Sequence, residues 1–567
     1  MKLTRVGFIG VGLVVGSTLA GGVVGGRVLA GGTRLDPQLR LYTQILSTIE
    51  QNYAEDVKSD RLVSSSIREM LRTLDPHSNF YEARDFSTLQ ERQKGQYYGL
   101  GITVQAIDGN ITVVAPFEGT PAHRLGIRAG DVISEIEGED ARGMAIDEAV
   151  KRLRGAKGTS VRVKISRQGY DQLLEFTVIR DAIPLHSVLY SFMLTRDVGY
   201  VRLVDFNEVT ACRPGEGADC ERELERALRE LSGLGAKALV LDIRDNPGGL
   251  LEQAFAVSNL FLTKGQLVVF TRGRTKRDES NYVTESESAW SGLPLVVLTS
   301  RHSASASEIV AGAIQDHDRG LVVGETTFGK GLVQTIMPLR NARGYALALT
   351  TARYYTPSGR SIQREYGGDT ALEDYYQPRD RKACDEGAGE VKLTDAGRKV
   401  FGGDGITPDF CVEPETPSRF VARLISRQAF LEFSHRFEPS EGAEGVQIAG
   451  TGSRSKVTSS KVRLIGRDFV VDESVLSEFK AFLSERKVRF SEQEIEENRA
   501  ALSREILEQV LVQVFGEGAA RRRTLAWDAQ VQKAIEVIPR AEVLLRDPGR
   551  YVAERDPSGR VASNDGR

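Results

Sequence analysis

Residues 295–323 read LVVLTSRHSASASEIVAGAIQDHDRGLVV, and this stretch decides the class of the fold. Its two ends, residues 295–299 and 321–323, are short runs rich in Val and Leu, the composition of strands buried on both faces. Between them, residues 308–315 are rich in Ile, Val and Ala, which predicts a helix. Because residues 237–243 form another such apolar run, the pattern predicts an α/β domain.

Three serines and a glutamate occupy the turn between the first strand and the helix, as Ser303-Ala304-Ser305-Ala306-Ser307-Glu308. A hydroxyl at a helix N-terminus lies where the helix dipole and the free N–H groups stabilise developing negative charge. That position suits a nucleophile. The alternative is that these residues only cap the helix, because Ser is a preferred N-cap residue. Composition leaves both interpretations open.

The segment Thr327-Phe328-Gly329-Lys330-Gly331-Leu332-Val333-Gln334 follows the strand at residues 321–323. Its glycines allow Lys330 to approach another backbone closely, and the four-residue spacing places Gln334 on the same face of a helix or a strand. To act as a base near neutral pH, Lys330 needs a pKa far below the ordinary lysine value, which requires burial without a carboxylate partner. The alternative is a solvated charge or a phosphate contact, although Gly331 breaks the GxxxxGK[ST] phosphate-loop pattern.

A third polar segment, Asp242-Ile243-Arg244-Asp245-Asn246-Pro247-Gly248-Gly249, follows the strand at residues 237–243. Glycine N–H groups at the end of a strand can stabilise an oxyanion, and the alternative is an ordinary tight turn. A catalytic histidine is disfavoured. His302 is three residues from Ser305 with no evident orienting carboxylate, and His317 lies beyond the third turn of the helix.

A different pattern occupies residues 99–153. Gly99-Leu100-Gly101-Ile102 opens an alternating strand, and the sequences GTPA at 119–122 and LGIRAGDVI at 125–133 precede a helical stretch at 146–153. This order resembles a PDZ domain, whose GLGF-type loop holds a peptide's terminal carboxylate while the peptide adds as a strand. The resemblance assigns that loop to Gly99, Leu100, Gly101 and Ile102, whereas a lone GxG would indicate only a hairpin turn. Alternation at residues 102–105 favours an apolar terminal residue in the ligand.

Length and composition exclude several classes of protein. The 567 residues correspond to about four domains at roughly 150 residues each. A content of 40% hydrophobic, 27% charged and 7% aromatic residues is that of ordinary soluble domains rather than collagen-like, disordered or polytopic membrane proteins. The net charge of −3 gives no sign of a nucleic-acid partner. No pair among the six His and four Cys has ligand spacing, so we expect no metal site.

The first thirty residues are typical of an export signal. Lys2 and Arg5 precede the uncharged run at residues 6–26, which consists mostly of Val, Leu, Ile, Ala and Gly. The run is long enough to remain as a membrane anchor, whereas Ala20 and Ala30 are suited to a signal peptidase. We therefore expect a periplasmic or cell-envelope protein, held in the inner membrane if the segment is not cleaved.

Export also determines how the four cysteines are interpreted. Cys212 and Cys220 flank a loop rich in Gly and Pro, and Cys384 and Cys411 flank another polar stretch. In an oxidising compartment two local disulfides are plausible, and the alternative is four unpaired thiols.

The chain divides by composition into six parts. The segment 441–460 is rich in Gly, Ser and Thr and reads as a linker, and Ser491-x-x-Glu494 is a capping box for a helix that runs to Phe515. Arg521 to Arg523 read as a solvated turn. The expected parts are residues 1–30 (signal peptide or anchor), 31–90 (helical unit), 91–183 (PDZ-like domain), 184–415 (α/β domain), 416–461 (linker) and 462–567 (helical extension with a polar tail).

These motifs together resemble the carboxyl-terminal processing peptidases, also called tail-specific proteases. Lys330, within GETTFGKGLVQ, follows Ser305 by 25 residues, as in that family. Four further segments agree with the family in its own order, from about residue 36 to 415: residues 74–78, 242–249, 349–360 and 405–409.

The resemblance implies a serine peptidase with a Ser/Lys dyad on a ClpP/crotonase-like α/β core that carries an inserted PDZ-like domain. It assigns Ser305 as the nucleophile, Lys330 as its general base and Gln334 as the group that orients Lys330. The N–H groups of Ala306 and of Gly248 or Gly249 would stabilise the oxyanion. No cofactor or metal is implied, and the partners are protein substrates bound by their C-termini.

Two departures from the family bear on function. His302 stands where many members have Gly, and residues after about 416 lie outside the resemblance, which leaves a role in homo-oligomerisation or adaptor binding open. The principal alternative is a membrane-anchored PDZ scaffold whose peptidase core binds peptides without cutting them. Acyl-CoA chemistry is a third hypothesis, which rests on fold analogy alone.

Overall fold

The structure is a computed structural model that describes residues 36–117, 119–167, 170–217, 220–366, 375, 389–440 and 463–555. The chain splits into two compact units, Met1–Phe80 and Tyr81–Arg567. The export segment, the linker at residues 441–460 and the polar tail from 556 onward lie outside the described residues. Among the residues that are described, no helix is long and apolar enough to cross a membrane.

The first unit contains the helices α2 (Asp36–Asn52) and α3 (Ser59–Arg72), in agreement with the helical spacing of its sequence. Their apolar residues are largely exposed, for example Leu41 at 57% and Met70 at 60%. The strand β1 (Asn79–Tyr81) and the helix α4 (Ala83–Lys94) follow.

The PDZ-like region is a β-rich body that a two-stranded ribbon joins to the rest of the unit. The ribbon pairs β2 (Gln96–Gly99) with β9 (Asp181–Pro184) in antiparallel register. The body is a six-stranded sheet in the order β3-β4-β5-β7-β8, with β6 beside β5, so that β3 is an edge strand. Its elements are β3 (Ile102–Ile107), β4 (Asn110–Pro116), α5 (Pro121–Arg124), β5 (Val132–Ile136), β6 (Glu139–Asp140), α6 (Ile146–Leu153), β7 (Ser160–Ser166) and β8 (Leu174–Ile179).

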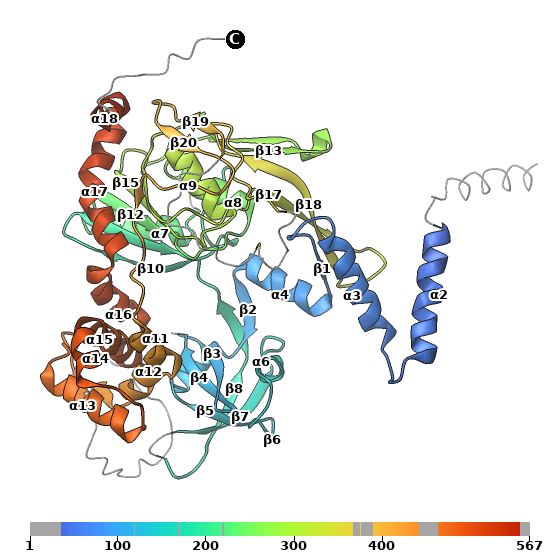
Figure 1. The fold of residues 1–567 in the computed structure, drawn as a ribbon, viewed down its shortest axis with the longest axis vertical. Coiled ribbons are helices and arrows are strands. Elements are labelled where there is room, and N and C mark those ends of the chain that lie inside the picture. Colours follow the sequence, from blue (N-terminus) through green and yellow to red (C-terminus); the bar gives the residue numbers. More distant parts are fainter. Residues whose placement is uncertain are drawn as a thin grey trace, which may run out of the picture. The chain divides into compact units, whose positions relative to one another are not determined.

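The α/β region is built on a six-stranded sheet in the order β10-β11-β12-β15-β16-β21. Figure 1 labels β10, β12 and β15 of this sheet. β10 pairs antiparallel with β11, and the remaining neighbours pair in parallel, which confirms the α/β class. The strands are β10 (Val188–Met193), β11 (Val198–Leu203), β12 (Ala238–Asp242), β15 (Leu295–Thr299), β16 (Leu321–Gly324) and β21 (Phe410–Cys411).

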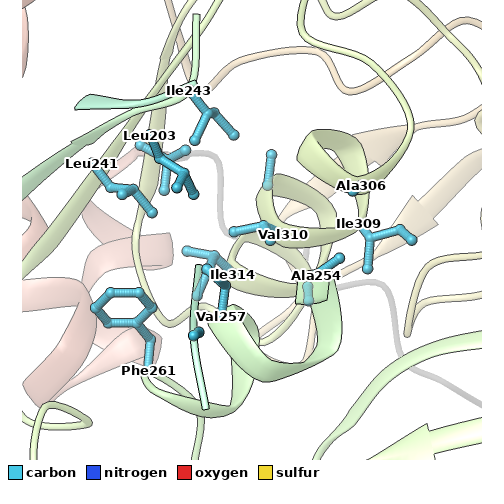
Figure 2. Close-up of a cluster of buried hydrophobic side chains, with 14 of the residues drawn as sticks. Leu203, Leu241, Ile243, Ala254, Val257, Phe261, Ala306, Ile309, Val310 and Ile314 are labelled. Atoms are coloured by element: carbon cyan, nitrogen blue, oxygen red, sulfur yellow. The ribbon is translucent and has the colours of Figure 1, made fainter. Parts of the chain in front are cut away.

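Alternate residues of these strands pack against different layers of helices. Leu239 and Leu241 belong to one buried cluster with residues of α7 (Glu223–Gly233), α8 (Leu251–Asn259) and α9 (Ala306–Asp316). Figure 2 shows Leu203, Leu241 and Ile243 facing Val257, Val310 and Ile314 in this cluster. Ala238 and Val240 belong to a second cluster with α17 (Ala529–Arg546). Strands buried on both faces account for the continuous apolar runs in the sequence.

An antiparallel ribbon completes the α/β region. β13 pairs with β14 and with β18, and β17 also pairs with β18. Its elements, with two smaller strands and a short 3-10 turn, are β13 (Leu267–Gly273), η1 (Lys276–Asp278), β14 (Ser280–Val283), β17 (Leu332–Pro338), β18 (Ala346–Tyr355), β19 (Val391–Leu393) and β20 (Lys399–Phe401).

The C-terminal extension is helical, with three differences from the sequence prediction. The linker expected at residues 416–461 is wrong over residues 419–439, which form two helices and a short strand because Phe420, Phe430 and Phe437 are buried in the hydrophobic cluster of the extension. The helix capped by Ser491 ends at Glu497, and a separate helix runs from Arg499 to Phe515. Arg521 to Arg523 belong to a helix rather than a turn, and that helix buries Ala520 in the core of the extension. The Arg523 guanidinium donates to the Arg467 carbonyl. The elements are α11 (Arg419–Ser426), α12 (Ala429–Ser434), β22 (Phe437–Pro439), β23 (Arg463–Ile465), α13 (Glu473–Glu485), α14 (Glu492–Glu497), α15 (Arg499–Phe515), α16 (Glu517–Thr524), η2 (Leu525–Trp527), α17 and α18 (Pro548–Arg555).

Candidate active site

The three serines of the turn before α9 have different environments. Ser303 and Ser307 are buried, and their hydroxyls donate to the Ile243 carbonyl at 2.8 Å and to the Asn246 carbonyl at 2.9 Å. Ser305 is partly exposed and is the N-cap residue of α9. Its φ of +56° is a strained conformation for a residue other than glycine, of a kind that is concentrated at functional sites. Of the three, Ser305 is therefore the one placed to react.

Glu308 joins the Ser305 turn to the Lys330 segment. Its carboxylate is fully buried and accepts hydrogen bonds from the backbone N–H groups of Ser305, Gly329 and Lys330 at 2.7–2.8 Å. The Thr327 hydroxyl donates to it at 2.6 Å. Burial raises the pKa of Glu308, while these four hydrogen bonds oppose that rise. From the sequence, Glu308 was interpreted only as a helix-capping residue, because a carboxylate three residues into a helix is typical of a cap.

Tyr354 of β18 makes a second link between the same two segments. Its hydroxyl donates to the Ser305 carbonyl at 3.1 Å and contacts the Lys330 carbonyl. Burial raises the pKa of Tyr354, so the hydroxyl stays protonated and able to donate. In addition, the Phe328 N–H donates to the Ser303 carbonyl at 2.9 Å. The fold thus places the backbones of Ser305 and Lys330 beside each other, although the residues are far apart in sequence.

Glycine is required on both sides of Lys330 because the backbone at residues 363–364 passes close to it. A Cβ atom on Gly329, whose φ is +90°, would lie 2.9 Å from the Arg364 Cβ. A Cβ atom on Gly331 would lie 2.9 Å from the Gln363 nitrogen, and the Gly331 N–H donates to Gln363 Oε1 at 2.8 Å. These contacts fit the close backbone approach that the sequence predicts for the segment.

Gln334 lies on β17, opposite Thr350 of β18, and its side-chain amide donates to the Thr350 hydroxyl at 3.4 Å. A register shift separates Val333 from Gln334, and Lys330 precedes the strand. The four-residue spacing predicts a shared face only for a regular strand or helix, and the segment from Lys330 to Gln334 is neither. A β-bulge changes which face a side chain occupies.

The loop after β12 packs directly on the Ser305 turn. The Asn246 carbonyl accepts the Ala304 N–H at 3.0 Å. A Cβ atom on Gly248, whose φ is +93°, would lie 2.8 Å from both the Ala306 nitrogen and the Ser305 Cβ. The Cα of Gly248 therefore lies against the backbone of the Ser305 turn and beside the first N–H of α9.

The two glycines of this loop have different surroundings. The Gly248 N–H donates to Asn246 Oδ1 at 2.9 Å. Gly249 pairs with Phe206 in an isolated bridge, and a Cβ atom on it would lie 2.3 Å from the Phe206 carbonyl oxygen. Both positions consequently require glycine for steric reasons.

The two histidines near the turn differ in their partners. His302 Nδ1 lies 3.1 Å from Asp245 Oδ1, so the expectation that His302 has no orienting carboxylate is wrong. Their separation of 57 positions in the chain concealed this pair in the sequence. His317 lies at the opposite end of α9, where its ring nitrogens contact Asp395 Oδ2 and the Leu267 carbonyl, each at 2.7 Å. His317 is thus a structural residue.

In the PDZ-like region, the loop from Gly99 to Ile102 is held in place by the chain at residues 117–122. The Leu100 and Gly101 carbonyls accept the N–H groups of Ala122 and Phe117 at 3.0 and 2.9 Å. Gly101 has a φ of +79°, and a Cβ atom there would lie 2.3 Å from the Thr120 Cβ. The loop leads into β3, for which β4 is the only paired neighbour within the described part of the chain.

The cysteines with described positions are disulfide-bonded. Cys212 and Cys220 form a disulfide with each other, and Cys411 is also disulfide-bonded, while Cys384 lies outside the described residues. Cys212, Cys220 and Glu216 lie close enough together to resemble a metal site. Because the two sulfurs are bonded to each other, they are not available there as thiolate ligands.

Comparison with known proteins identifies two family matches and a set of relatives. The model of peptidase family S41 matches residues 197–370, and the PDZ domain model matches residues 88–166. The carboxy-terminal-processing protease of Bartonella bacilliformis is 40% identical over 326 residues, which cover 58% of this chain and 73% of that protein. The carboxy-terminal processing protease CtpA of Bacillus subtilis is 34% identical, covering 59% of this chain and 68% of that protein.

Among solved structures, a photosystem II D1 C-terminal processing protease is 28% identical to this chain. The match covers 65% of this chain and 85% of that chain, with a TM-score of 0.34.

Proposed function

Because the chain belongs to the carboxy-terminal processing proteases of peptidase family S41, we propose that Ser305 and Lys330 form its catalytic dyad. The observation that carries this proposal is the Glu308 carboxylate, which accepts the N–H groups of both residues at 2.8 Å. The Tyr354 hydroxyl, which contacts both carbonyls, supports it independently.

The proposed reaction begins when the neutral amine of Lys330 takes the proton from the Ser305 hydroxyl. The Ser305 oxygen then attacks the scissile carbonyl carbon, the C–N bond breaks, and the Lys330 ammonium returns the proton to the leaving amine. Water, activated by Lys330, hydrolyses the resulting acyl-enzyme and frees Ser305. In this scheme Gln334 orients Lys330, although its contact with Thr350 places it on the β17–β18 pair rather than in the Lys330 loop.

Two backbone N–H groups are proposed to stabilise the oxyanion. Ala306, the first residue of α9, supplies one of them, where the helix dipole adds to the effect. The second comes from Gly248 or Gly249. Gly248 lies nearer to Ser305, but its N–H is donated to Asn246 Oδ1, so this amide serves the oxyanion only if it is shared or released.

The PDZ domain is proposed to select substrates by their free C-termini. Since β3 pairs with β4 and with no other strand among the residues that the structure describes, its other edge can accept a peptide as an additional strand. Ile102 and Val104 are partly exposed on β3, which favours an apolar terminal residue. The loop from Gly99 to Ile102 is the proposed carboxylate site at the beginning of this strand.

We place this activity in the cell envelope. The support is the charged start and the uncharged run of residues 6–26, together with the Cys212–Cys220 disulfide, which is typical of an oxidising compartment. In this proposal an uncleaved N-terminal segment holds the protein in the inner membrane.

The proposal is tested by the intact masses of a protein substrate with an apolar C-terminal residue after incubation with the full-length chain in mild detergent. The parent should cut the substrate near its C-terminus, and Ser305→Ala and Lys330→Ala should not. Lys264→Ala, at an exposed lysine of the same region, is the matched control and should retain activity. Equal cleavage by all variants would refute the dyad, whereas binding without cleavage by the parent would favour the PDZ scaffold.

A further inference from the structure

Arg244 connects the loop after β12 to the C-terminal extension. On the loop side, its guanidinium binds both oxygens of Asp242, the last residue of β12, at 2.6–3.1 Å. On the other side, its Nη1 donates to Asp528 Oδ2 at 2.7 Å and to Gln530 Oε1 at 2.8 Å. The Arg244 side chain is 13% exposed, so these contacts are largely shielded from solvent.

Asp528 and Gln530 are fixed at the start of α17. Asp528 is the N-cap residue, and its Oδ1 accepts the Gln530 and Val531 N–H groups while Oδ2 holds Arg244. Gln530 is 2% exposed, and its amide donates to the Val412 carbonyl at 2.8 Å. The N-terminus of α17 is therefore a rigid acceptor for the Arg244 guanidinium.

The body of α17 packs on the sheet that carries the active-site turns. Val531, Ala534 and Val537 are buried in one cluster with Val240 of β12 and Val296 of β15. These two strands lead into the Arg244 loop and the Ser305 turn (Figure 1). This close packing fixes the helix against both strands.

The Arg244 loop in turn supports the Ser305 turn. Two residues after Arg244, the Asn246 carbonyl accepts the Ala304 N–H and the Ser307 hydroxyl, and Gly248 lies against Ser305 and Ala306. Arg244 is the point at which a displacement of α17 would be transmitted to these contacts.

We infer that α17, acting through Asp528 and Gln530 on Arg244, is a positioning element for the loop that carries the proposed second oxyanion donor, Gly248 or Gly249. The segment after residue 416, which lies outside the sequence resemblance, thus contributes to catalysis without touching substrate. This inference rests on the proposed peptidase function. Asp528 and Gln530 are positioning residues, so their loss should lower kcat. KM should stay unchanged, because substrate binding is proposed to depend on the PDZ domain.

The test compares Asp528→Ser with two other variants in the full-length chain. Ser also caps helices but is too short to reach Arg244, so the cap is retained and the link is lost. Asp528→Asn retains the cap and an uncharged polar group, and should rescue part of the activity. The matched control is Asp472→Ser, which changes the N-cap residue of α13 in the same way. The Asp472 carboxylate pairs with Arg463 and not with a residue of the active-site loops.

We expect kcat to fall about tenfold to a hundredfold in Asp528→Ser, the range for small misplacement of catalytic groups. KM should stay at the parental value, and Asp472→Ser should match the parent in both constants. An unchanged kcat in Asp528→Ser would overturn the inference. So would a loss of activity that follows the fraction of unfolded protein in the same sample.

Hydrogen–deuterium exchange provides a readout independent of catalysis. Amides at residues 244–250 should exchange faster in Asp528→Ser than in the parent or Asp472→Ser, and unchanged protection would overturn the inference. A parent that cuts no substrate while Asp528→Ser loosens the loop would refute the proposed function and leave the positioning role of α17 standing.

Discussion

Replacing Gly248 by Ala adds a single Cβ atom at the proposed oxyanion site. The new Cβ would lie 2.7 Å from the Ala304 carbonyl oxygen and 2.8 Å from both the Ala306 nitrogen and the Ser305 Cβ. Two of these three neighbours are backbone atoms in a buried turn, so the loop must move rather than a side chain. Movement of the loop separates the Gly248 and Gly249 amides from Ser305.

The expected magnitudes follow from two separate effects. The φ of +93° costs an L-residue about 1–2 kcal/mol of folding stability. Loss of one oxyanion donor raises the barrier by about 2.7–4 kcal/mol, which lowers kcat by about 10²–10³-fold. The reduction in kcat should therefore exceed what the loss of stability alone produces.

Gly265→Ala is the matched control. Gly265 has a φ of +87° in the same region, and a Cβ atom there has no neighbour within 4 Å. It should lose a similar amount of stability and keep its kcat. The assay measures kcat and KM on a fluorogenic peptide, and thermal unfolding by circular dichroism. A kcat of Gly248→Ala within about threefold of the parent, less than ~1 kcal/mol of barrier, would refute the placement of the oxyanion site.

Three further predictions concern other parts of the molecule. Tyr354→Phe removes the hydroxyl that contacts the Ser305 and Lys330 carbonyls. It should lower the free energy of unfolding, measured by denaturant titration, by about 1–3 kcal/mol, and it should reduce kcat in steady-state kinetics. A parental kcat would show that this link is dispensable. Gly101→Ala places a Cβ 2.3 Å from the Thr120 Cβ. It should raise KM for substrates with a free C-terminus more than it changes kcat. Equal KM values for the variant and the parent would argue against the PDZ loop as the carboxylate site. Glu223 raises the pKa of His186, so this pair contributes stability that is fully present below pH ~6.5 and is lost as pH rises through the folded-state value. His186→Gln should therefore lower the melting temperature at pH 5.5 but not at pH 8.5, and a pH-independent difference would exclude the ion pair as its cause.

The elements of the α/β core could be predicted because local composition determines them. The apolar runs at residues 237–243 and 295–299 correspond to β12 and β15, and the Ile/Val/Ala-rich stretch corresponds to α9. Strands buried on both faces and a helix buried on nearly all sides leave a strong signal in a single sequence.

The contacts that organise the site could not be predicted, because they join residues distant in the chain. Glu308 looks like a capping residue locally, and its bonds to Gly329 and Lys330 appear only when α9 meets the following loop. Likewise, 284 residues separate Arg244 from Asp528. The register shift between Val333 and Gln334 leaves no mark in the amino-acid composition of the segment, so the sequence alone predicts a regular strand or helix there.

Trapping the acyl-enzyme shows whether Ser305 is the nucleophile and whether Lys330 activates it. A peptide ester is mixed with the full-length chain, the reaction is quenched in acid, and the intact mass of the protein is measured. We expect a mass increase equal to the acyl group, mapped to the peptide that contains Ser305, and absent in Ser305→Ala and Lys330→Ala. An adduct on another residue, or one that persists in Ser305→Ala, would contradict it.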